Sequence, residues 1–358
     1  MMRFRRVWIG ILTALALTVA GCSRIAPGSW PGVAVGPETV WVAYQQQVFA
    51  VARETGVARW AFPLQPERDQ LFFAAPQLTP DGQTLVVGGY DGVLYGLDPA
   101  TGAEKWTFTA ARDRYIAAAL VTEQGIYAPN GDGTLYALTL QGTPRWTFTA
   151  EAALWAPPAT DGETLYLASL DHHLYALDAA TGQEQWRVNL EGALPATPTL
   201  LDGVLYVGEL ATQVAAVDAA DGTVLWQTPV AAWVWHSPTP LGDDRLVVGD
   251  MDGHVYALRR DDGGIVWQAQ VEGGVIGAPA VHDDTVFVTT RAGLLVALDA
   301  TSGAVRWQRQ VHEEASIEAG PVVVPDLGLL LAPSDAANPL LAVGFDGQPL
   351  WSFVPEKK

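Results

Sequence analysis

The chain has 358 residues, of which 49% are apolar, and it contains 36 glycines, 14 tryptophans and a single cysteine. This composition is typical of a globular protein and excludes a disordered, collagen-like or disulfide-stapled chain. Its 39 acidic residues outnumber its 20 lysines and arginines, which gives a formal net charge of −19. Because binding of nucleic acid depends on neutralising phosphates, we expect no nucleic-acid partner.

The first 29 residues have the pattern of an export signal followed by a short tether. Residues 1–21 begin with a cluster of arginines, continue with an apolar run and end in small residues. This pattern is typical of a signal peptide, and the run is short for a permanent membrane span. The segment Val19–Cys22 resembles the bacterial lipobox, in which cleavage precedes a cysteine that receives lipid. The resemblance implies a lipid anchor at Cys22 and a tether over residues 22–29; the alternative is an ordinary signal peptide with a stray cysteine.

The residue after the cysteine bears on the destination of the protein. Ser23, in place of an aspartate, resembles the signal that sorts lipoproteins to the outer membrane in bacteria with two membranes. We therefore expect an exported lipoprotein at the periplasmic face of the outer membrane if the source has two membranes. If the source has one membrane, we expect the outer face of the cell membrane. Because several acyl chains hold a protein stably, the lipid provides the attachment to the membrane.

Eight tryptophans mark a repeat along the rest of the chain. They lie 40 to 46 residues apart, and each closes a similar phrase, such as ALDAATGQEQW at residues 176–186. Within each unit, short β-rich runs are separated by Gly and Asp turns. Four strands per unit, repeated eight times, predict an all-β fold, an eight-bladed β-propeller with four antiparallel strands per blade over residues 30–355. The blades end near Trp60, Trp106, Trp146, Trp186, Trp226, Trp267, Trp307 and Trp351.

Each predicted blade is continuous in sequence. The first unit contains four strand candidates before its tryptophan at position 60, and Trp351 lies in the fourth strand candidate of the last unit. An exchange of strands between the two ends of the chain is therefore not required. We expect the ring to close by packing between the first and last blades.

The phrase A-x-D-x-x-T-G-x-x-x-W resembles the repeat of the PQQ-type, or quinoprotein-like, propellers. The resemblance covers about residues 30–355 and implies that each repeat tryptophan docks between neighbouring blades. The WD40 repeat has the same period, but its tryptophan is followed by Asp. Here the tryptophan is followed by Ala, Thr, Arg, Gln or Ser, so WD40 is disfavoured.

Two branches of the PQQ-type propellers imply different functions. Quinoprotein dehydrogenases bind PQQ and Ca²⁺ in the propeller centre and carry long insertions, whereas BamB is a cofactor-free lipoprotein of the outer-membrane β-barrel assembly machinery. A lipobox followed by eight nearly unadorned blades resembles BamB. We therefore expect a membrane-anchored, non-enzymatic scaffold that binds protein partners, with no catalytic residue, cofactor or metal. The alternatives are a PQQ-dependent dehydrogenase with calcium and an extracellular binding lipoprotein of a single-membrane bacterium.

Aromatic residues that break the repeat are the candidate binding residues. In a propeller, the connections from an outer strand to the next inner strand surround one mouth of the central channel. Aromatic side chains there combine a large contact area with a polar handle, so we expect them to bind a protein partner. The alternatives are that they plug the channel or stack on a cofactor. Aligning the blades on the proline of the innermost strand gives seven such residues: Phe72, Phe73, Tyr115, Trp155, Trp233, Trp235 and His236.

Overall fold

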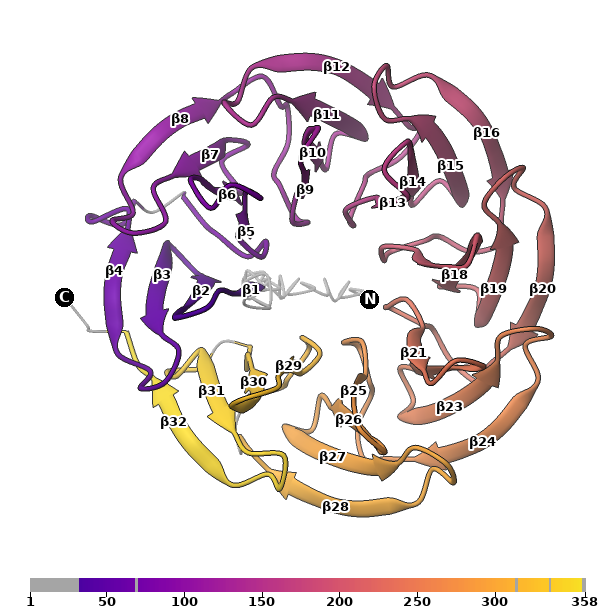
Figure 1. Cartoon of the computed structure of the whole chain (residues 1–358). Coiled ribbons are helices and arrows are strands. Elements are labelled where there is room, and N and C mark those ends of the chain that lie inside the picture. The colour runs from indigo at the N-terminus through magenta and orange to yellow at the C-terminus, as the bar shows by residue number, and fades with distance from the viewer. Residues whose placement is uncertain (1–31, 68–69, 313–314, 335, 356–358) are drawn as a thin grey trace, which may run out of the picture.

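The computed structural model describes residues 32–67, 70–312, 315–334 and 336–355. Within these ranges, 32 strands form eight four-stranded antiparallel sheets that radiate from a central axis (Figure 1). The described residues contain no helix that could span a membrane. The predicted eight-bladed, all-β propeller is confirmed. The predicted signal peptide, tether and lipidated Cys22 lie outside the described residues.

The sheets follow one another in chain order, and each runs from an inner to an outer strand. Blades one to four comprise β1 (Gly32–Val35), β2 (Thr39–Tyr44), β3 (Gln47–Ala52), β4 (Ala58–Phe62), β5 (Gln77–Leu78), β6 (Leu85–Gly88), β7 (Leu94–Leu97), β8 (Glu104–Phe108), β9 (Leu120–Thr122), β10 (Gly125–Pro129), β11 (Thr134–Leu138), β12 (Pro144–Thr149), β13 (Ala159–Thr160), β14 (Thr164–Ala168), β15 (His173–Asp178) and β16 (Glu184–Asn189). Blades five to eight comprise β17 (Thr199–Leu201), β18 (Val204–Glu209), β19 (Gln213–Asp218), β20 (Val224–Pro229), β21 (Thr239–Leu241), β22 (Arg245–Gly249), β23 (His254–Arg259), β24 (Ile265–Gln270), β25 (Ala280–His282), β26 (Thr285–Thr289), β27 (Leu294–Asp299), β28 (Val305–Gln310), β29 (Val322–Val324), β30 (Gly328–Leu331), β31 (Leu340–Val343) and β32 (Pro349–Phe353).

Burial differs between the middle and the outer strands of a blade. The middle strands are packed on both faces by neighbouring blades, so they read as continuous apolar runs, such as the four buried residues within β15. The outer strands are half exposed, and in β16 only alternate residues are partly buried. A β-bulge interrupts every outer strand just before its tryptophan; in blade four, Ala176 pairs with Trp186 and Leu177 pairs with Glu184.

The eight repeat tryptophans, called here the docking tryptophans, link each blade to the next. Each indole packs on the glycine of the turn between the third and fourth strands of the following blade. A methyl group on any of these glycines would lie less than 3.0 Å from a ring carbon, and their φ angles lie between +70° and +78°. Glycine therefore satisfies two requirements at once, the left-handed turn and the close approach of the indole.

The ring closes by the same contact that joins the other blades. Trp351 of β32 packs on Gly56 in the turn before β4, which brings the last blade against the first (Figure 1). Blade one consists of β1–β4 and blade eight of β29–β32. The prediction that no strand is exchanged between the ends of the chain is confirmed.

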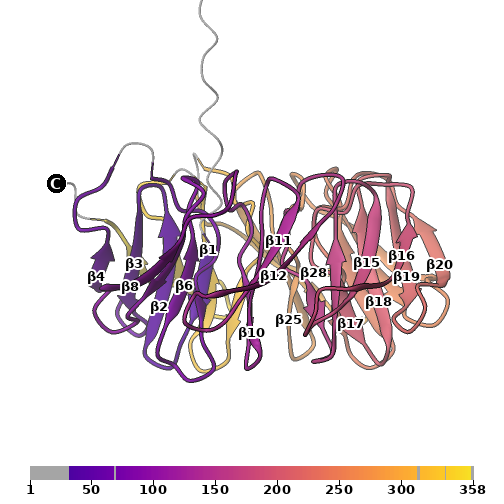
Figure 2. The same cartoon turned by 90° about the horizontal axis from the view of Figure 1, so that it is seen from above.

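The two faces of the propeller carry different connections. One face carries the connections from an outer strand to the next inner strand together with the turns between second and third strands, and we call it the mouth face. The opposite face carries the other turns, and Figure 2 shows the blades side-on between the two faces. Gly32 pairs with Ala43 near the end of β2, so β1 begins at the mouth face.

Candidate functional site

The mouth face is held together by a repeated pair of backbone hydrogen bonds. In each connection, one amide donates to a carbonyl in the second-to-third-strand turn of the preceding blade; the Val234 amide, for example, donates to the Glu209 carbonyl at 3.3 Å. The residue before it accepts from the turn of its own blade, as the Trp233 carbonyl does from the Met251 amide at 3.0 Å. Seven connections are thereby fixed in register, which makes the face a rigid platform.

The residue that donates the first of these bonds is a packing anchor. All seven such side chains are buried between blades, and they are Phe72, Tyr115, Leu154, Leu194, Val234, Val275 and Ile317. Two predicted binding residues, Phe72 and Tyr115, therefore belong to the core. Phe72 packs edge-on against Phe62 and Tyr95, and burial raises the pKa of the Tyr115 hydroxyl. Neither side chain is exposed on the mouth face.

The residue after each anchor lines the mouth of the channel. These residues, called here the mouth ring, surround a hollow of about 340 Å³, together with small alanines and prolines. Six of the seven are apolar, and the single acid, Glu318, lies 3.7 Å from the Arg291 guanidinium. The members are Phe73, Ile116, Trp155, Pro195, Trp235, Ile276 and Glu318.

Three predicted residues meet in this ring. Trp155 and Trp235 stack across the mouth with ring centroids 6.3 Å apart and an interplanar angle of 20°. They enter from the connections before β13 and β21, so the connection of blade five lies between them in sequence. Phe73 packs edge-on against Tyr90 at 4.6 Å, and the Arg114 guanidinium lies over the other aromatic ring, 5.4 Å from the Tyr90 centroid.

Trp233 faces solvent on the same face. Its side chain is 52% exposed, although its carbonyl is fixed by the Met251 amide. An exposed tryptophan on a rigid backbone loses little conformational freedom when a partner covers it. Trp and Tyr are the residues on which binding energy concentrates in protein interfaces.

His236 has a structural environment. Its side chain is buried, Nδ1 lies 2.9 Å from the Ser237 carbonyl and Nε2 accepts from the Gly249 amide at 3.2 Å. Burial lowers the pKa of His236 to about 4. Both ring nitrogens are thus occupied in the neutral form, with Nδ1 donating to the carbonyl.

Glu209 and Asp250 are the fully buried acids of this face among the described residues. One carboxylate oxygen of Glu209 accepts from the Gly192 amide at 3.0 Å, whereas Oε1 is buried and makes no hydrogen bond of ordinary geometry among the described residues. Burial raises the pKa of Glu209. The equivalent acid of blade six, Asp250, accepts a hydrogen bond from the Tyr256 hydroxyl at 3.1 Å. Blade five has Ala215 at the position of that tyrosine and so lacks this donor.

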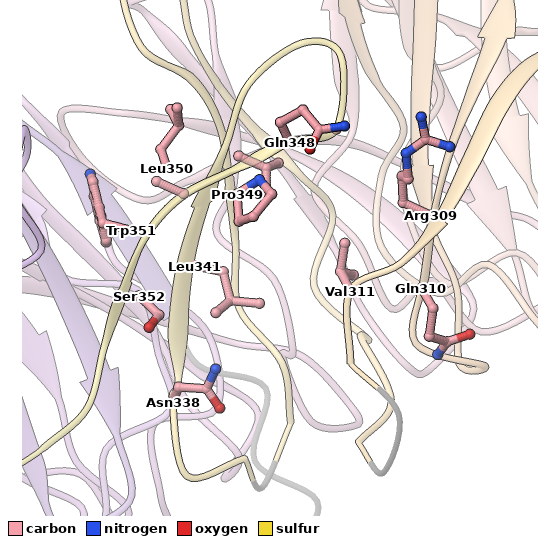
Figure 3. A pocket seen from close by; sticks show the side chains of 13 residues that line it. Arg309, Gln310, Val311, Asn338, Leu341, Gln348, Pro349, Leu350, Trp351 and Ser352 are labelled. Atoms are coloured by element: carbon pink, nitrogen blue, oxygen red, sulfur yellow. The ribbon is translucent and has the colours of Figure 1, made fainter.

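A second hollow, of about 590 Å³, lies on the circumference between blades seven and eight (Figure 3). Its walls come from β28, which contributes Arg309 and Gln310, and from blade eight, which contributes Leu341 and Pro349. The docking tryptophan Trp351 also lines it. This hollow is a groove between two neighbouring blades, whereas the hollow at the mouth is lined by residues from the connections of seven blades.

The mouth ring does not fit the PQQ and calcium of the dehydrogenase alternative. PQQ carries three carboxylates, but the lining of the hollow contains no lysine or arginine. Calcium takes six to eight oxygen ligands, whereas the lining has a single carboxylate, that of Glu318, which faces Arg291. No group of three or more His, Cys, Asp and Glu side chains within the described ranges is arranged to hold a metal.

Comparisons with known proteins agree with this architecture. The family model described as "Outer membrane protein assembly factor BamB" matches residues 44–154, 131–232 and 210–354. The crystal structure of BamB from Moraxella catarrhalis is 22% identical, with a TM-score of 0.70 over 88% of this chain and 91% of that chain. The computationally designed Ika8 protein is 16% identical, with a TM-score of 0.70 over 92% of this chain and 98% of its own. At these identities, the two structures show the likeness of fold alone.

No curated protein is significantly similar in sequence to the chain. The three matched segments of the family model overlap and together run from residue 44 to residue 354. They include all seven described connections of the mouth face and seven of the eight blades in full. The chain therefore belongs to the PQQ_2 family, the family of the outer membrane protein assembly factor BamB.

Proposed function

We propose that this protein is a non-enzymatic scaffold that binds another polypeptide through its mouth face during the assembly of outer-membrane proteins. The observation that carries the proposal is an apolar, aromatic ring with the exposed Trp233 beside it, on a face whose backbone is fixed by repeated hydrogen bonds. Large apolar side chains held in place before binding are suited to protein contacts. Membership of the BamB family supports the role in assembly.

A lipid anchor at Cys22 fits this arrangement. β1 begins at the mouth face with Gly32, and the ten residues from Cys22 to Pro31 reach at most about 35 Å when extended. Anchoring at Cys22 in the outer membrane would hold the mouth face near the periplasmic surface of that membrane. The proposed partners are then membrane-embedded or membrane-bound assembly proteins.

Site-specific photo-cross-linking in intact cells tests the proposal. A photoreactive amino acid is placed at position 233 in one variant and at position 57 in a control variant. Val57 is 63% exposed and follows the turn glycine on the opposite face. We expect position 233 to give a discrete adduct with an assembly protein and position 57 to give none. Equal adducts from both positions, or none from position 233, would contradict a binding role of the mouth face.

A further inference from the structure

Each outer strand contacts the next blade at a second position besides the docking tryptophan. This position lies two residues after the tryptophan, on the same face of the strand, so its side chain also points toward the next blade. Four blades have phenylalanine there, and each phenylalanine lies against an aromatic ring of the following blade, with centroids 5.1 to 5.4 Å apart. The four pairs are Phe62 with Tyr95, Phe108 with Tyr136, Phe148 with Tyr175, and Phe353 with Phe49. An aromatic pair is therefore the commonest filling between two blades at this level.

Blade seven departs from this pattern because it places a cation at the second position. Three other blades have Val188, Thr228 and Ala269 there, whereas blade seven has Arg309. The Arg309 side chain is exposed, although the side chains at the seven equivalent positions are buried or partly buried. The residue of blade eight at the place of the aromatic partner is Leu341. Both members of the aromatic pair are thus missing between blades seven and eight.

The groove of about 590 Å³ between blades seven and eight lies where this pair is missing, since Arg309 and Leu341 both line it. Figure 3 shows Arg309 and Val311 on one wall and Leu341 and Pro349 on the other. Gln348, from the turn before β32, also lines the groove. A flat ring inserted between the two walls would contact apolar carbon on both of its sides. The groove therefore offers an apolar slot at the level where other blades hold aromatic rings of their own.

Arg309 has no acidic partner within the described part of the chain. Its Nη1 donates to a backbone carbonyl of its own strand at 3.1 Å, and its guanidinium carbon lies 5.7 Å from the centre of the Trp307 ring. Arg306 of the same strand, in contrast, pairs with Asp284 at 2.7 Å and with Asp299 at 2.6 Å. Although the chain has 39 acidic residues, the lining of the groove contains neither Asp nor Glu. The Arg309 guanidinium therefore remains free to bind a carboxylate from another molecule.

We propose that this groove, called here the seam groove (Arg309, Val311, Leu341, Gln348 and Pro349), binds a surface loop of a partner protein that presents an aromatic side chain next to a carboxylate. The aromatic ring lies between the apolar walls, where other blades place their own aromatic pair, and the carboxylate accepts hydrogen bonds from the Arg309 guanidinium. This inference goes beyond the proposed function, because the seam groove lies on the circumference and shares no residue with the hollow at the mouth.

The strands beside the seam groove favour a loop over an added strand. β28 carries Arg306 and Arg309, and β32 begins with Pro349. Charged residues and proline at a sheet edge disfavour the pairing of a further strand, so recognition depends on side chains. The net charge of −19 repels a strongly acidic partner, and the groove offers a single cation. The proposed motif is therefore one lone acid beside one aromatic residue, such as the dipeptide Phe-Asp.

Titration of the full, folded protein with short peptides tests the proposal. The probe is the peptide Gly-Ser-Phe-Asp-Gly-Ser, blocked at both ends so that the aspartate supplies its only carboxylate. One control peptide has alanine in place of the phenylalanine, and the other has asparagine in place of the aspartate. Methyl NMR spectra report on Val311 and Leu341 and give the dissociation constant. We expect saturable shifts of both residues with a Kd below about 1 mM, and binding of each control at least about fivefold weaker.

Variants of the chain separate the seam groove from other surfaces. R309F introduces the residue that four blades have at this position, so it fills the slot and removes the charge, whereas R309Q removes the charge alone. R187Q removes an exposed arginine from β16 and is the matched control. We expect R309F to bind the probe at least about tenfold more weakly, R309Q to lose the preference for aspartate over asparagine, and R187Q to bind like the wild type. Thermal unfolding shows that all three variants fold.

Several outcomes would overturn the inference. Equal binding of the probe by R309F and the wild type would show that the seam groove is not the site, and loss of binding in W233A would place the peptide on the mouth face. Equal binding of N-acetylphenylalanine and the probe would assign the groove to a free carboxylate and not to a loop. Sedimentation that reveals a dimer lost in R309F would assign the groove to a second copy. Absence of peptide binding together with a cross-link from position 233 would refute this inference and leave the proposed function intact.

Discussion

Two groups of tryptophans in this propeller differ in how often they recur along the chain and in what their rings contact. The docking tryptophans occur once per blade, and Trp267 is the most buried of them: it is 7% exposed, its indole N–H donates to the Ala300 carbonyl at 3.1 Å and its ring covers Gly303. Trp155, Trp233 and Trp235 occur once each and lie on the mouth face. The comparison indicates that repetition reports packing between blades, whereas a departure from the repeat reports what is particular to this chain.

Removal of a docking tryptophan is expected to have the largest effect. W267A empties the contact between blades six and seven, so we expect it to lower the free energy of unfolding by about 3–5 kcal/mol. W233A removes a half-exposed side chain and is expected to change it by less than about 0.5 kcal/mol. Chemical denaturation of both variants measures the difference. Comparable losses in the two variants would remove the distinction between the groups.

His236 lies at the mouth, but we expect it to behave as a packing residue. Its pKa is lowered to about 4 by burial, so the unfolded chain binds a proton near pH 6.5 that the folded chain does not. The associated stability is present above pH 6.5 and is lost as the pH falls toward 4, by an amount on the order of 3 kcal/mol. Denaturation at several pH values should show a flatter profile for H236Q than for the wild type. Parallel profiles would contradict the buried, neutral histidine.

The turn glycines allow the docking contact to be separated from backbone strain. Gly303 and Gly203 have φ angles of +73° and +77°, but only Gly303 faces an indole, and Gly203 faces open space. Both alanine variants are strained by the left-handed backbone, whereas G303A also displaces Trp267. We expect G303A to be less stable than G203A by about 2 kcal/mol in chemical denaturation. Equal losses would mean that the indole contact contributes little.

The buried acids of blades five and six are expected to respond in opposite directions. Because burial raises the pKa of Glu209, its contribution to stability is greatest at low pH and is lost as the pH rises through the folded-state pKa. E209Q is therefore expected to stabilise the protein by about 1 kcal/mol at pH 7 and less at pH 4. D250N removes an acceptor from the Ala232 amide and the Tyr256 hydroxyl, so it should destabilise the protein. Stabilisation by both variants would contradict this difference.

The stacked pair at the mouth is expected to show a small coupling. A double-mutant cycle of W155A and W235A measures the coupling between the two rings in the free energy of unfolding. For offset aromatic pairs, we expect a coupling of about 0.5–1.5 kcal/mol. A coupling near zero would mean that the two indoles meet without stabilising the mouth.

The fold could be predicted from the sequence because every blade repeats the same short sequence features. The docking glycine, the tryptophan and the short apolar strands recur at a fixed period, and each is required by the packing of one blade on the next. The turn between the third and fourth strands could also be predicted from its Asp and Gly residues. In blade four, for example, the Asp178 carboxylate accepts a hydrogen bond from the Thr181 amide.

The alignment on proline did not separate anchors from ring residues, and it shifts in one blade. The anchor Leu154 lies three residues before Pro157, whereas Val234 lies four residues before Pro238. Anchor and ring residues are adjacent in sequence, so Phe72 was grouped with Phe73 although one is core and the other lines the mouth. Hydrogen bonds to the turns define the correct alignment, and they depend on contacts between blades that no local pattern reports. The unpaired Oε1 of Glu209 could not be predicted from the sequence, because it depends on Ala215 of the neighbouring strand, where blade six has Tyr256.

The most direct test compares partner recovery and stability in one variant. Tagged wild-type, W233A and V57A proteins are purified from membranes of the source organism, and co-purified assembly proteins are quantified alongside the thermal unfolding midpoint. The account predicts that W233A loses most of its partner while its midpoint stays at the wild-type value, and that V57A retains both. Full recovery of the partner by W233A, or a loss that accompanies a lowered midpoint, would contradict a binding role for the mouth face.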